Sequence, residues 1–193
     1  MGKHFGTIVW GIVFILININ IGFIDILPNV VGYILITSAV SKLYDKTKIK
    51  EFHIATYVGL VCAVVRIITF FFFLSQNSEV TILSTAIGTI VQLLILVLGF
   101  YLYEAVIKLL EKEKVQLVEQ IKSGRNFFLY VQLIASFVMT FSLNVAEGTA
   151  ITMNFICACA MIITMIVWAV NMNTVRKYFN GQLNTENANN YLE

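Results

Sequence analysis

One arginine stands inside a long apolar run, which makes it the residue of greatest chemical interest in the chain. Arg66 lies in the stretch ATYVGLVCAVVRIITFFFFL, about nine residues before the polar segment SQNSE. In a helix this separation corresponds to about 13 Å, which is too deep for the side chain to reach water easily. A guanidinium at the middle of a bilayer costs at least about 2.5–3.5 kcal/mol, so we expect Arg66 to face a bundle interior.

Polar residues recur at helical spacing in three other apolar runs, and each set lies on a single helix face. The sets are Asn18, Gly22, Asp25 and Asn29; Thr81, Thr85, Gly88, Gln92 and Gly99; and Gln132, Ser136, Thr140, Asn144 and Glu147. We expect a polar seam that opens at the level of Asp25 and Glu147 and deepens to Arg66. The candidate binding or polar-core residues are Arg66, Asp25, Asn18, Gln92, Gln132, Ser136, Thr140, Asn144 and Glu147.

Two interpretations of this seam are open. In the structural one, Arg66 pairs with Asp25 or Glu147, and the amides and hydroxyls hydrogen-bond between helices at about 0.6 kcal/mol each. In the functional one, a water-filled vestibule receives a small polar or anionic solute, and Arg66 anchors its charge.

The elements that hold these residues are predicted to be membrane helices. The chain is 59% hydrophobic and only 12% charged, whereas soluble domains carry about 25% charged residues. This composition argues against a soluble enzyme, a secreted disulfide scaffold, a disordered protein and a nucleic-acid binder. Six apolar runs are long enough to span a bilayer as helices. They are Phe5–Ile24, Leu27–Tyr44, His53–Leu74, Val80–Tyr103, Phe127–Leu143 and Ala150–Met172.

Lysine and arginine set the expected orientation. Apart from Arg66, they all lie before the first run, between the second and third, between the fourth and fifth, or after the sixth. Because positive residues mark the cytoplasmic side, both termini are expected in the cytoplasm. The sequence thus predicts an all-α, six-transmembrane-helix domain over residues 1–172, followed by a short, frayed polar cytoplasmic tail over 173–193.

The segment EAVIKLLEKEKVQLVEQIK, at about residues 105–122, is amphipathic and precedes Gly124. A straight extension into the cytoplasm would climb roughly 24 Å, which a single turn at Gly124 could not recover. We therefore expect a helix along the inner membrane surface. Two roles stay open for it, a plain connector or a docking surface for a cytoplasmic protein partner.

No constellation for enzyme chemistry is recognisable. Cys62, Cys157 and Cys159 fall inside apolar runs and suit packing, and His4 and His53 show no metal-ligand spacing. We therefore expect no catalytic residues, no metal and no cofactor.

One segment carries a resemblance. In ININIGFIDILPNVVGYILI (Ile17–Ile36), the residues Asp25, Ile26, Leu27, Pro28, Gly32 and Tyr33 match a pattern D-I-L-P-[DN]-x-x-G-Y. The segment resembles the N-terminal part of small integral membrane proteins of Gram-positive bacteria that have no known activity, and Asn29 stands where those proteins more often have Asp. The resemblance implies a multi-pass protein of the bacterial plasma membrane.

The expected function is a non-enzymatic component that binds or passes a small polar solute or ion through a polar interior open to the outside. The alternative is a regulatory, immunity-type or accessory membrane subunit that acts through helix–helix contact with a protein partner.

Overall fold

The fold is all-helical. The structure, a computed structural model, describes residues 1–17, 26–74 and 82–190, with side chains for 1–17, 29–69, 87–142, 144–146 and 148–181. Over these ranges it contains six α-helices, one short 3-10 turn and no strand, which confirms the all-α part of the predicted fold class. The elements are α1 (Gly2–Leu16), α2 (Ile26–Thr47), α3 (Lys50–Leu74), α4 (Ile82–Lys112), α5 (Val118–Phe141), η2 (Ser142–Asn144) and α6 (Glu147–Asn190).

Three of the described helices are long and apolar enough to cross a membrane. They contain Lys50–Thr69 of α3, Ile87–Lys112 of α4 and Gly148–Gly181 of α6. Helix α1 is also apolar but shorter in its described part, Gly2–Leu16. A helix must supply about 20 apolar residues to span the hydrocarbon core, so these three segments indicate a membrane protein.

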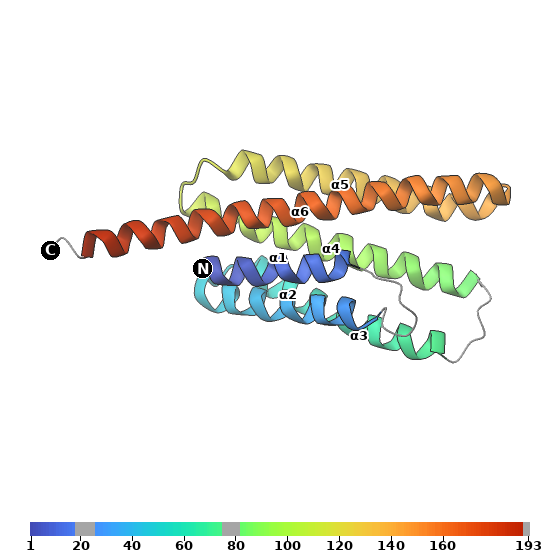
Figure 1. Ribbon diagram of the computed structural model, residues 1–193, viewed down its shortest axis with the longest axis horizontal. Helices are drawn as coiled ribbons and strands as arrows, with labels where there is room; N and C mark the ends of the chain where they lie inside the picture. The colour runs from blue at the N-terminus through green and yellow to red at the C-terminus, as the bar shows by residue number, and fades with distance from the viewer. Residues whose placement is uncertain (18–25, 75–81, 191–193) are drawn as a thin grey trace.

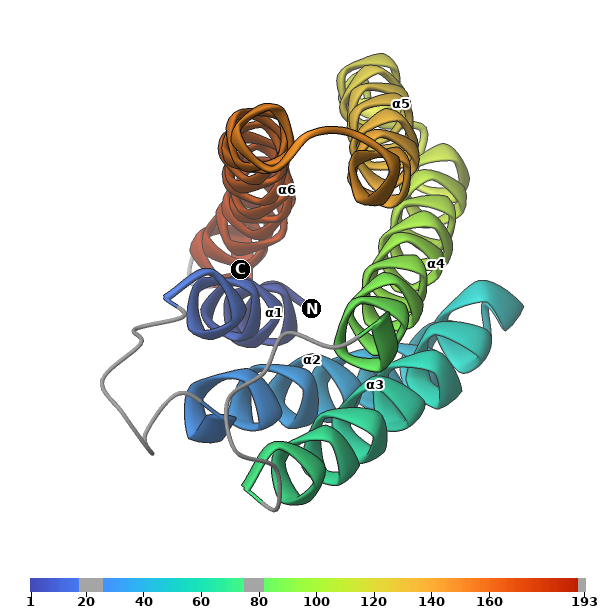
Figure 2. The same cartoon turned by 90° about the vertical axis from the view of Figure 1, so that its right-hand side faces the viewer.

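The six helices form a ring in chain order (Figure 2). Each packs against the helices before and after it, and α6 packs against α1 to close the ring. The N-terminus and the turns α2–α3 and α4–α5 lie at one end of the bundle, and the α5–α6 turn lies at the other (Figure 1). We call the first the lysine-rich end, because its two turns carry Lys46, Lys48, Lys50, Lys112 and Lys114.

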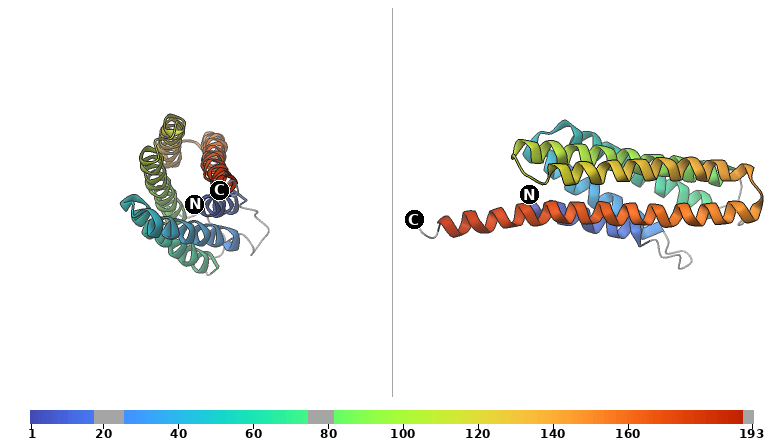
Figure 3. Two further views of the ribbon diagram at one scale, coloured as in Figure 1. Left: turned by 90° about the vertical axis from the view of Figure 1, so that its left-hand side faces the viewer. Right: turned by 90° about the horizontal axis from the view of Figure 1, so that it is seen from above.

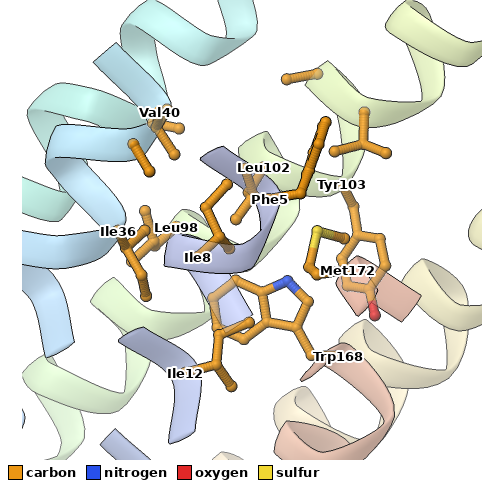
Figure 4. Close-up of a cluster of buried hydrophobic side chains, with 14 of the residues drawn as sticks. Phe5, Ile8, Ile12, Ile36, Val40, Leu98, Leu102, Tyr103, Trp168 and Met172 are labelled. Atoms are coloured by element: carbon orange, nitrogen blue, oxygen red, sulfur yellow. The ribbon is translucent and has the colours of Figure 1, made fainter. Parts of the chain in front are cut away.

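Apolar side chains fill the ring toward the lysine-rich end (Figure 4). The labelled side chains are buried and come from α1, α2, α4 and α6: Phe5, Ile8, Ile12, Ile36, Val40, Leu98, Leu102, Tyr103, Trp168 and Met172. The indole Nε1 of Trp168 is buried here without a hydrogen-bond partner among the described residues. Because four helices contribute, this core ties the first and last helices to the middle of the chain.

Two glycines let α1 and α2 approach each other closely. A Cβ on Gly32 would lie 2.6 Å from the carbonyl oxygen of Gly11, and a Cβ on Gly11 would lie 2.8 Å from the carbonyl oxygen of Gly32. Membrane helices use small residues in this way, because close backbone contact supplies van der Waals attraction that the hydrophobic effect does not provide in lipid.

The expected surface helix over 105–122 does not form a separate element. Helix α4 continues to Lys112, and α5 begins at Val118. Between them Lys114 takes a left-handed conformation at φ 52°. The amide of Val115 donates to the Leu110 carbonyl at 3.0 Å, and that of Lys114 donates to Glu111 at 3.1 Å. These bonds make a Schellman turn without glycine. It reverses the chain earlier than Gly124, which lies inside α5.

The expected fraying after residue 172 is not observed either. Helix α6 continues to Asn190 and extends past the start of α1 (Figure 3). Its next turns pack on α1, since Val175 and Phe179 are buried and the Phe179 ring stacks on Phe5 at 5.7 Å. The buried apolar residues continue the helical spacing that begins with Trp168 and Met172. The asparagines between them obscure this pattern in the sequence.

The Schellman turn yields a stability prediction. Lys114→Gly should stabilise the protein by about 1 kcal/mol, because a side chain in the left-handed region costs about 1–2 kcal/mol, part of which glycine loses again through unfolded-chain entropy. SDS titration of the detergent-solubilised protein would measure the change. Lys112→Gly, two residues earlier in α4, should instead destabilise by about 1 kcal/mol. A loss of stability in both variants would contradict the assignment of the turn.

Candidate functional site

Arg66 lies about two thirds of the way along α3 from Lys50 and is half-buried. It is about 24 Å from Lys50 at the lysine-rich end and about 12 Å from Leu74 at the other end, at 1.5 Å per residue. Cys62, one turn away on α3, is buried and lies within electrostatic reach of the guanidinium. Arg66 is therefore far from both ends of α3 along the helix axis and half-buried, and its orientation toward the bundle interior stays a prediction.

Helix α2 presents two hydroxyls to this part of α3. Tyr33 and Thr37 are one turn apart, Tyr33 is fully buried, and its hydroxyl interacts electrostatically with Arg66. The Thr37 Oγ1 atom would lie only 2.5 Å from a Cβ on Gly59. Glycine at position 59 therefore makes room for the Thr37 hydroxyl on the same face of α3 as Arg66, seven residues on.

These side chains share an unusual property. The atoms Arg66 Nε, Tyr33 Oη and Thr37 Oγ1 are all buried, and none forms a hydrogen bond of good geometry within the described ranges, although the Tyr33 hydroxyl lies within hydrogen-bonding reach of the Arg66 guanidinium. Buried polar groups are normally hydrogen-bonded, and each exception calls for an explanation. All three atoms can donate a hydrogen, so the arrangement suits a group rich in acceptor oxygens. We call Arg66, Tyr33 and Thr37 the arginine cluster.

No described carboxylate neutralises the arginine cluster. The six acidic side chains that the structure describes all belong to residues 45–51 or 104–119 near the lysine-rich end, and Arg66 forms no ion pair with them. The expected partners lie elsewhere: Asp25 is outside the described residues, and Glu147 begins α6 but its side chain is outside them. The pairing of Arg66 with either acid therefore stays a prediction.

A second polar group joins α4, α5 and α6. The amide nitrogen of Gln92 donates to Gln132 Oε1, and Gln132 Nε2 donates to Thr164 Oγ1 at 2.9 Å. The Thr164 hydroxyl in turn donates to the Met161 carbonyl at 2.7 Å. Gln132 and Thr164 are 1% and 0% exposed, whereas Gln92 is half-buried, and the described hydrogen bonds leave this group nearly saturated. We call Gln92, Gln132 and Thr164 the glutamine network.

The rest of the predicted stripe on α5 runs from the glutamine network toward the α5–α6 turn. Ser136 donates to the Gln132 carbonyl at 2.8 Å, and Thr140 donates to the Ser136 carbonyl at 2.9 Å. Ser136 is buried, whereas Thr140 and Asn144 are exposed. Exposure therefore rises along the stripe toward the end opposite the lysines, but the hydroxyls there are already bonded to their own helix.

The structure thus brings together some predicted residues and separates others. Gln92 and Gln132 are in direct contact, while Arg66 belongs to the α2–α3 interface, and no hydrogen bond in the described part joins the two groups. Asn18 lies, like Asp25, outside the described residues. The described candidates therefore form two polar groups.

Some contributing residues were not singled out from the sequence. Thr164 is a lone threonine in an apolar run, and Tyr33 and Thr37 follow Asn29 at intervals of four residues on α2. Asn171 donates to the buried Tyr103 hydroxyl at 3.1 Å, and its amide lies where a Cβ on Gly124 would be. The four-residue spacing on α2 was a usable signal for Tyr33 and Thr37, whereas nothing in the sequence marked Thr164 or Asn171.

Ion pairs at the lysine-rich end hold α3, α4 and α5 together. Lys108 binds Glu51 at 2.5 Å, Arg125 binds Glu104, and Lys122 binds Glu111 at 3.1 Å. The hydrogen bond that Lys122 donates to the Glu111 carboxylate raises the pKa of Lys122 above its ordinary value. Among the described residues, no three or more His, Cys, Asp and Glu side chains gather as a metal site would require.

Comparison of the chain with protein-family models, curated proteins and solved structures finds no match. The function therefore has to be inferred from the polar side chains inside the helix bundle.

Proposed function

We propose that the protein spans the bacterial plasma membrane six times with both termini in the cytoplasm. The distribution of apolar surface supports this, because every helix carries a large apolar side chain that is more than half exposed. Examples from α1 to α6 are Trp10, Ile34, Ile68, Ile90, Phe137 and Phe155. Such a surface would be a liability in water and suits lipid tails. The lysine-rich end would face the cytoplasm.

We propose further that the protein is a non-enzymatic component that binds a small anionic or polar solute at the arginine cluster. The observation that carries this proposal is the set of three buried atoms, Arg66 Nε, Tyr33 Oη and Thr37 Oγ1, none of which forms a hydrogen bond of good geometry among the described residues. A solute oxygen can accept from the guanidinium and from both hydroxyls. Intramembrane ionisable groups commonly mark solute or ion paths.

The position of Arg66 along α3 favours access of a solute from the outer side. Arg66 is about 12 Å from the end of α3 that would face outside, and about twice as far from the lysine-rich end. Toward the lysine-rich end, the centre of the ring is filled by side chains such as Leu98, Leu102 and Trp168. A solute would therefore enter from the outer end and stop at Arg66.

A second candidate function is that of an accessory subunit bound to another membrane protein. Its support is the low burial of α6. Only 17% of the most apolar stretch in Gly148–Gly181 is buried, against 50% of the most apolar stretch in Ile87–Lys112 of α4. Lipid or a partner protein would then cover this helix. If the protein acts in this way, no solute should bind to the wild type, and replacing Arg66 should not change that result.

The binding test is a set of thermal unfolding measurements in detergent at constant ionic strength. The probes are phosphate, sulfate, acetate and glutamate. At least one probe should raise the unfolding temperature of the wild type by mass action. Arg66→Gln should weaken that binding by at least about tenfold, because a charge-assisted hydrogen bond contributes about 1.5–3 kcal/mol. Tyr33→Phe and Thr37→Val should each weaken it less, and Arg66→Lys should retain part of it.

The matched control is Arg176→Gln, which removes the same charge at the other end of the bundle and should leave probe binding unchanged. Two outcomes would contradict the proposal. One is the absence of any shift with all four probes. The other is equal destabilisation of the probe-free protein by Arg66→Gln and Asp25→Asn with probe binding intact, which would assign Arg66 to an ion pair.

A further inference from the structure

Two contacts fix the register of α2 against α3 around the arginine cluster. The Tyr44 ring stacks on the His53 ring at 4.5 Å, and Thr37 Oγ1 lies 2.5 Å from the position of a Cβ on Gly59. The two helices run antiparallel along each other (Figure 1), so each step back along α2 matches a step forward along α3. Tyr33, four residues before Thr37, therefore lies opposite the turn of α3 that contains the arginine.

The Arg66 side chain belongs to the same interface. Side chains in a helix lean toward its N-terminus, which directs the guanidinium along α3 toward Gly59. The Tyr33 hydroxyl is within hydrogen-bonding and electrostatic reach of the guanidinium. The donors of Arg66, Tyr33 and Thr37 therefore follow one line along the α2–α3 interface.

The hydroxyl of Thr37 differs from those of the neighbouring threonines. Thr47, Thr56 and Thr69 donate to the carbonyl four residues earlier in their own helix, at 2.8, 2.9 and 2.5 Å. This bond is a common one for threonine in a helix. Thr37 Oγ1 makes no hydrogen bond within the described ranges and lies at Gly59 instead. Its hydrogen is available to a further acceptor, whereas that of Thr69 is already used.

The described part of the arginine cluster carries one positive charge. Tyrosine and threonine hydroxyls are uncharged at neutral pH, so the guanidinium supplies all of it. The one acid of α3, Glu51, is fifteen residues from the arginine, about 22 Å along the helix, and it binds Lys108. Glu104 of α4 is bound to Arg125. These acids are therefore too distant, and already paired, to neutralise the cluster.

The side chains around the arginine cluster are apolar. Leu98 of α4 lies 3.7 Å from the position of a Cβ on Gly59. Because α4 runs antiparallel to α3, its preceding turns, which carry Ile95 and Val91, lie level with the arginine, and both residues are buried. Cys62 of α3 is buried as well. An unpaired charge in such surroundings has no neighbouring group to compensate it and is costly.

We infer that the arginine cluster takes monovalent oxyanions, such as a small carboxylate or sulfonate, in preference to divalent anions and uncharged solutes. The inference rests on the solute site proposed above and names the class of solute that it binds. A monovalent anion forms a neutral complex with the guanidinium, and its oxygens also accept from the hydroxyls. A divalent anion would leave one negative charge unpaired, and an uncharged solute would leave the guanidinium unpaired.

The test uses three tetrahedral sulfur compounds of similar size: sulfate, methanesulfonate and dimethyl sulfone, which carry two, one and no negative charges. Isothermal titration calorimetry measures their binding to the whole protein in phosphatidylcholine nanodiscs, at neutral pH and constant ionic strength. Methanesulfonate should bind at least about tenfold more tightly than either of the others, because each of those leaves a buried charge unpaired. Acetate, a monovalent anion of another shape, should also bind more tightly than sulfate.

Two threonine variants supply a matched control. Thr37→Val removes the available hydroxyl and should weaken methanesulfonate binding by about three- to fivefold. Thr69→Val removes a hydroxyl that donates to its own helix and should leave this binding unchanged. Arg66→Gln should abolish the preference for the monovalent anion, and Arg66→Lys should keep it. If the Arg66 variants do not fold, the order of the three compounds in the wild type decides.

The outcomes separate this inference from the proposed function. Sulfate binding as tight as that of methanesulfonate, and lost in Arg66→Gln, would overturn the inference and leave the solute site standing. Equally tight binding of dimethyl sulfone would also overturn it, since an acid such as Asp25 would then already neutralise Arg66. If neither these compounds nor the four earlier probes bind, the proposed function itself fails.

Discussion

Replacing Gly32 by alanine is expected to destabilise the bundle by about 1–3 kcal/mol, the usual cost of overpacking a tight contact. The new Cβ would lie 2.6 Å from the Gly11 carbonyl oxygen, 2.7 Å from Ile15 Cγ1 and 3.2 Å from the Ile15 amide nitrogen. Two of these three atoms belong to the backbone, so no rotamer change can relieve the contact. Helix α1 would have to move away from α2, and its core contacts through Ile8 and Ile12 would loosen.

Alanine is also a better helix former than glycine by about 1 kcal/mol, which opposes this loss. The control Gly88→Ala isolates that term, because a Cβ on Gly88 meets no atom within 4 Å. We therefore expect opposite signs in an SDS unfolding titration, with Gly32→Ala less stable than wild type and Gly88→Ala equal or more stable. Stabilisation by both substitutions would mean that α1 and α2 do not cross at these glycines.

The helices were predictable because long apolar runs have few structural solutions in lipid. The wrong boundary between α4 and α5 has a clear physical cause. Lys114 takes a left-handed conformation that glycine normally adopts, so the end of α4 carried no sequence signal, and Gly124 was assigned the role instead. In the structure Gly124 lies inside α5 and leaves space for Asn171. Glycine in a membrane helix thus marks close packing at least as often as an end.

The sequence showed on which face of each helix the polar residues lie, but it did not show which residues of other helices they contact. Spacing placed Gln92 and Gln132 on polar stripes, and the structure joins them directly. Spacing does not reveal which interface a stripe faces, because that depends on the order of helices around the ring. Since α3 packs between α2 and α4, Arg66 meets Tyr33 of α2. The closure of the ring by α1 and α6 is a long-range contact that no local pattern encodes.

Gln132→Leu is expected to destabilise the protein by about 1–2 kcal/mol, because it leaves the half-buried Gln92 amide donor without its acceptor. Thr164 is affected less, since its hydroxyl still donates to the Met161 carbonyl at 2.7 Å. The control is Gln120→Leu, the same substitution at an exposed position of the same helix, where we expect a change within about 0.5 kcal/mol. Reversible unfolding in SDS would measure both variants.

The double variant Gln92→Leu/Gln132→Leu tests whether the two amides act as a pair. Removing both partners from an apolar setting can be nearly neutral, so the double variant should lose less stability than the two single losses added together. The coupling should lie near about 0.6 kcal/mol and not exceed about 1.7 kcal/mol, the mean and the maximum for side-chain hydrogen bonds between membrane helices. Simple additivity would show that Gln92 and Gln132 are not bonded and that the glutamine network does not join α4 to α5. Coupling with unchanged probe binding at Arg66 would make the network a structural link, distinct from the solute site.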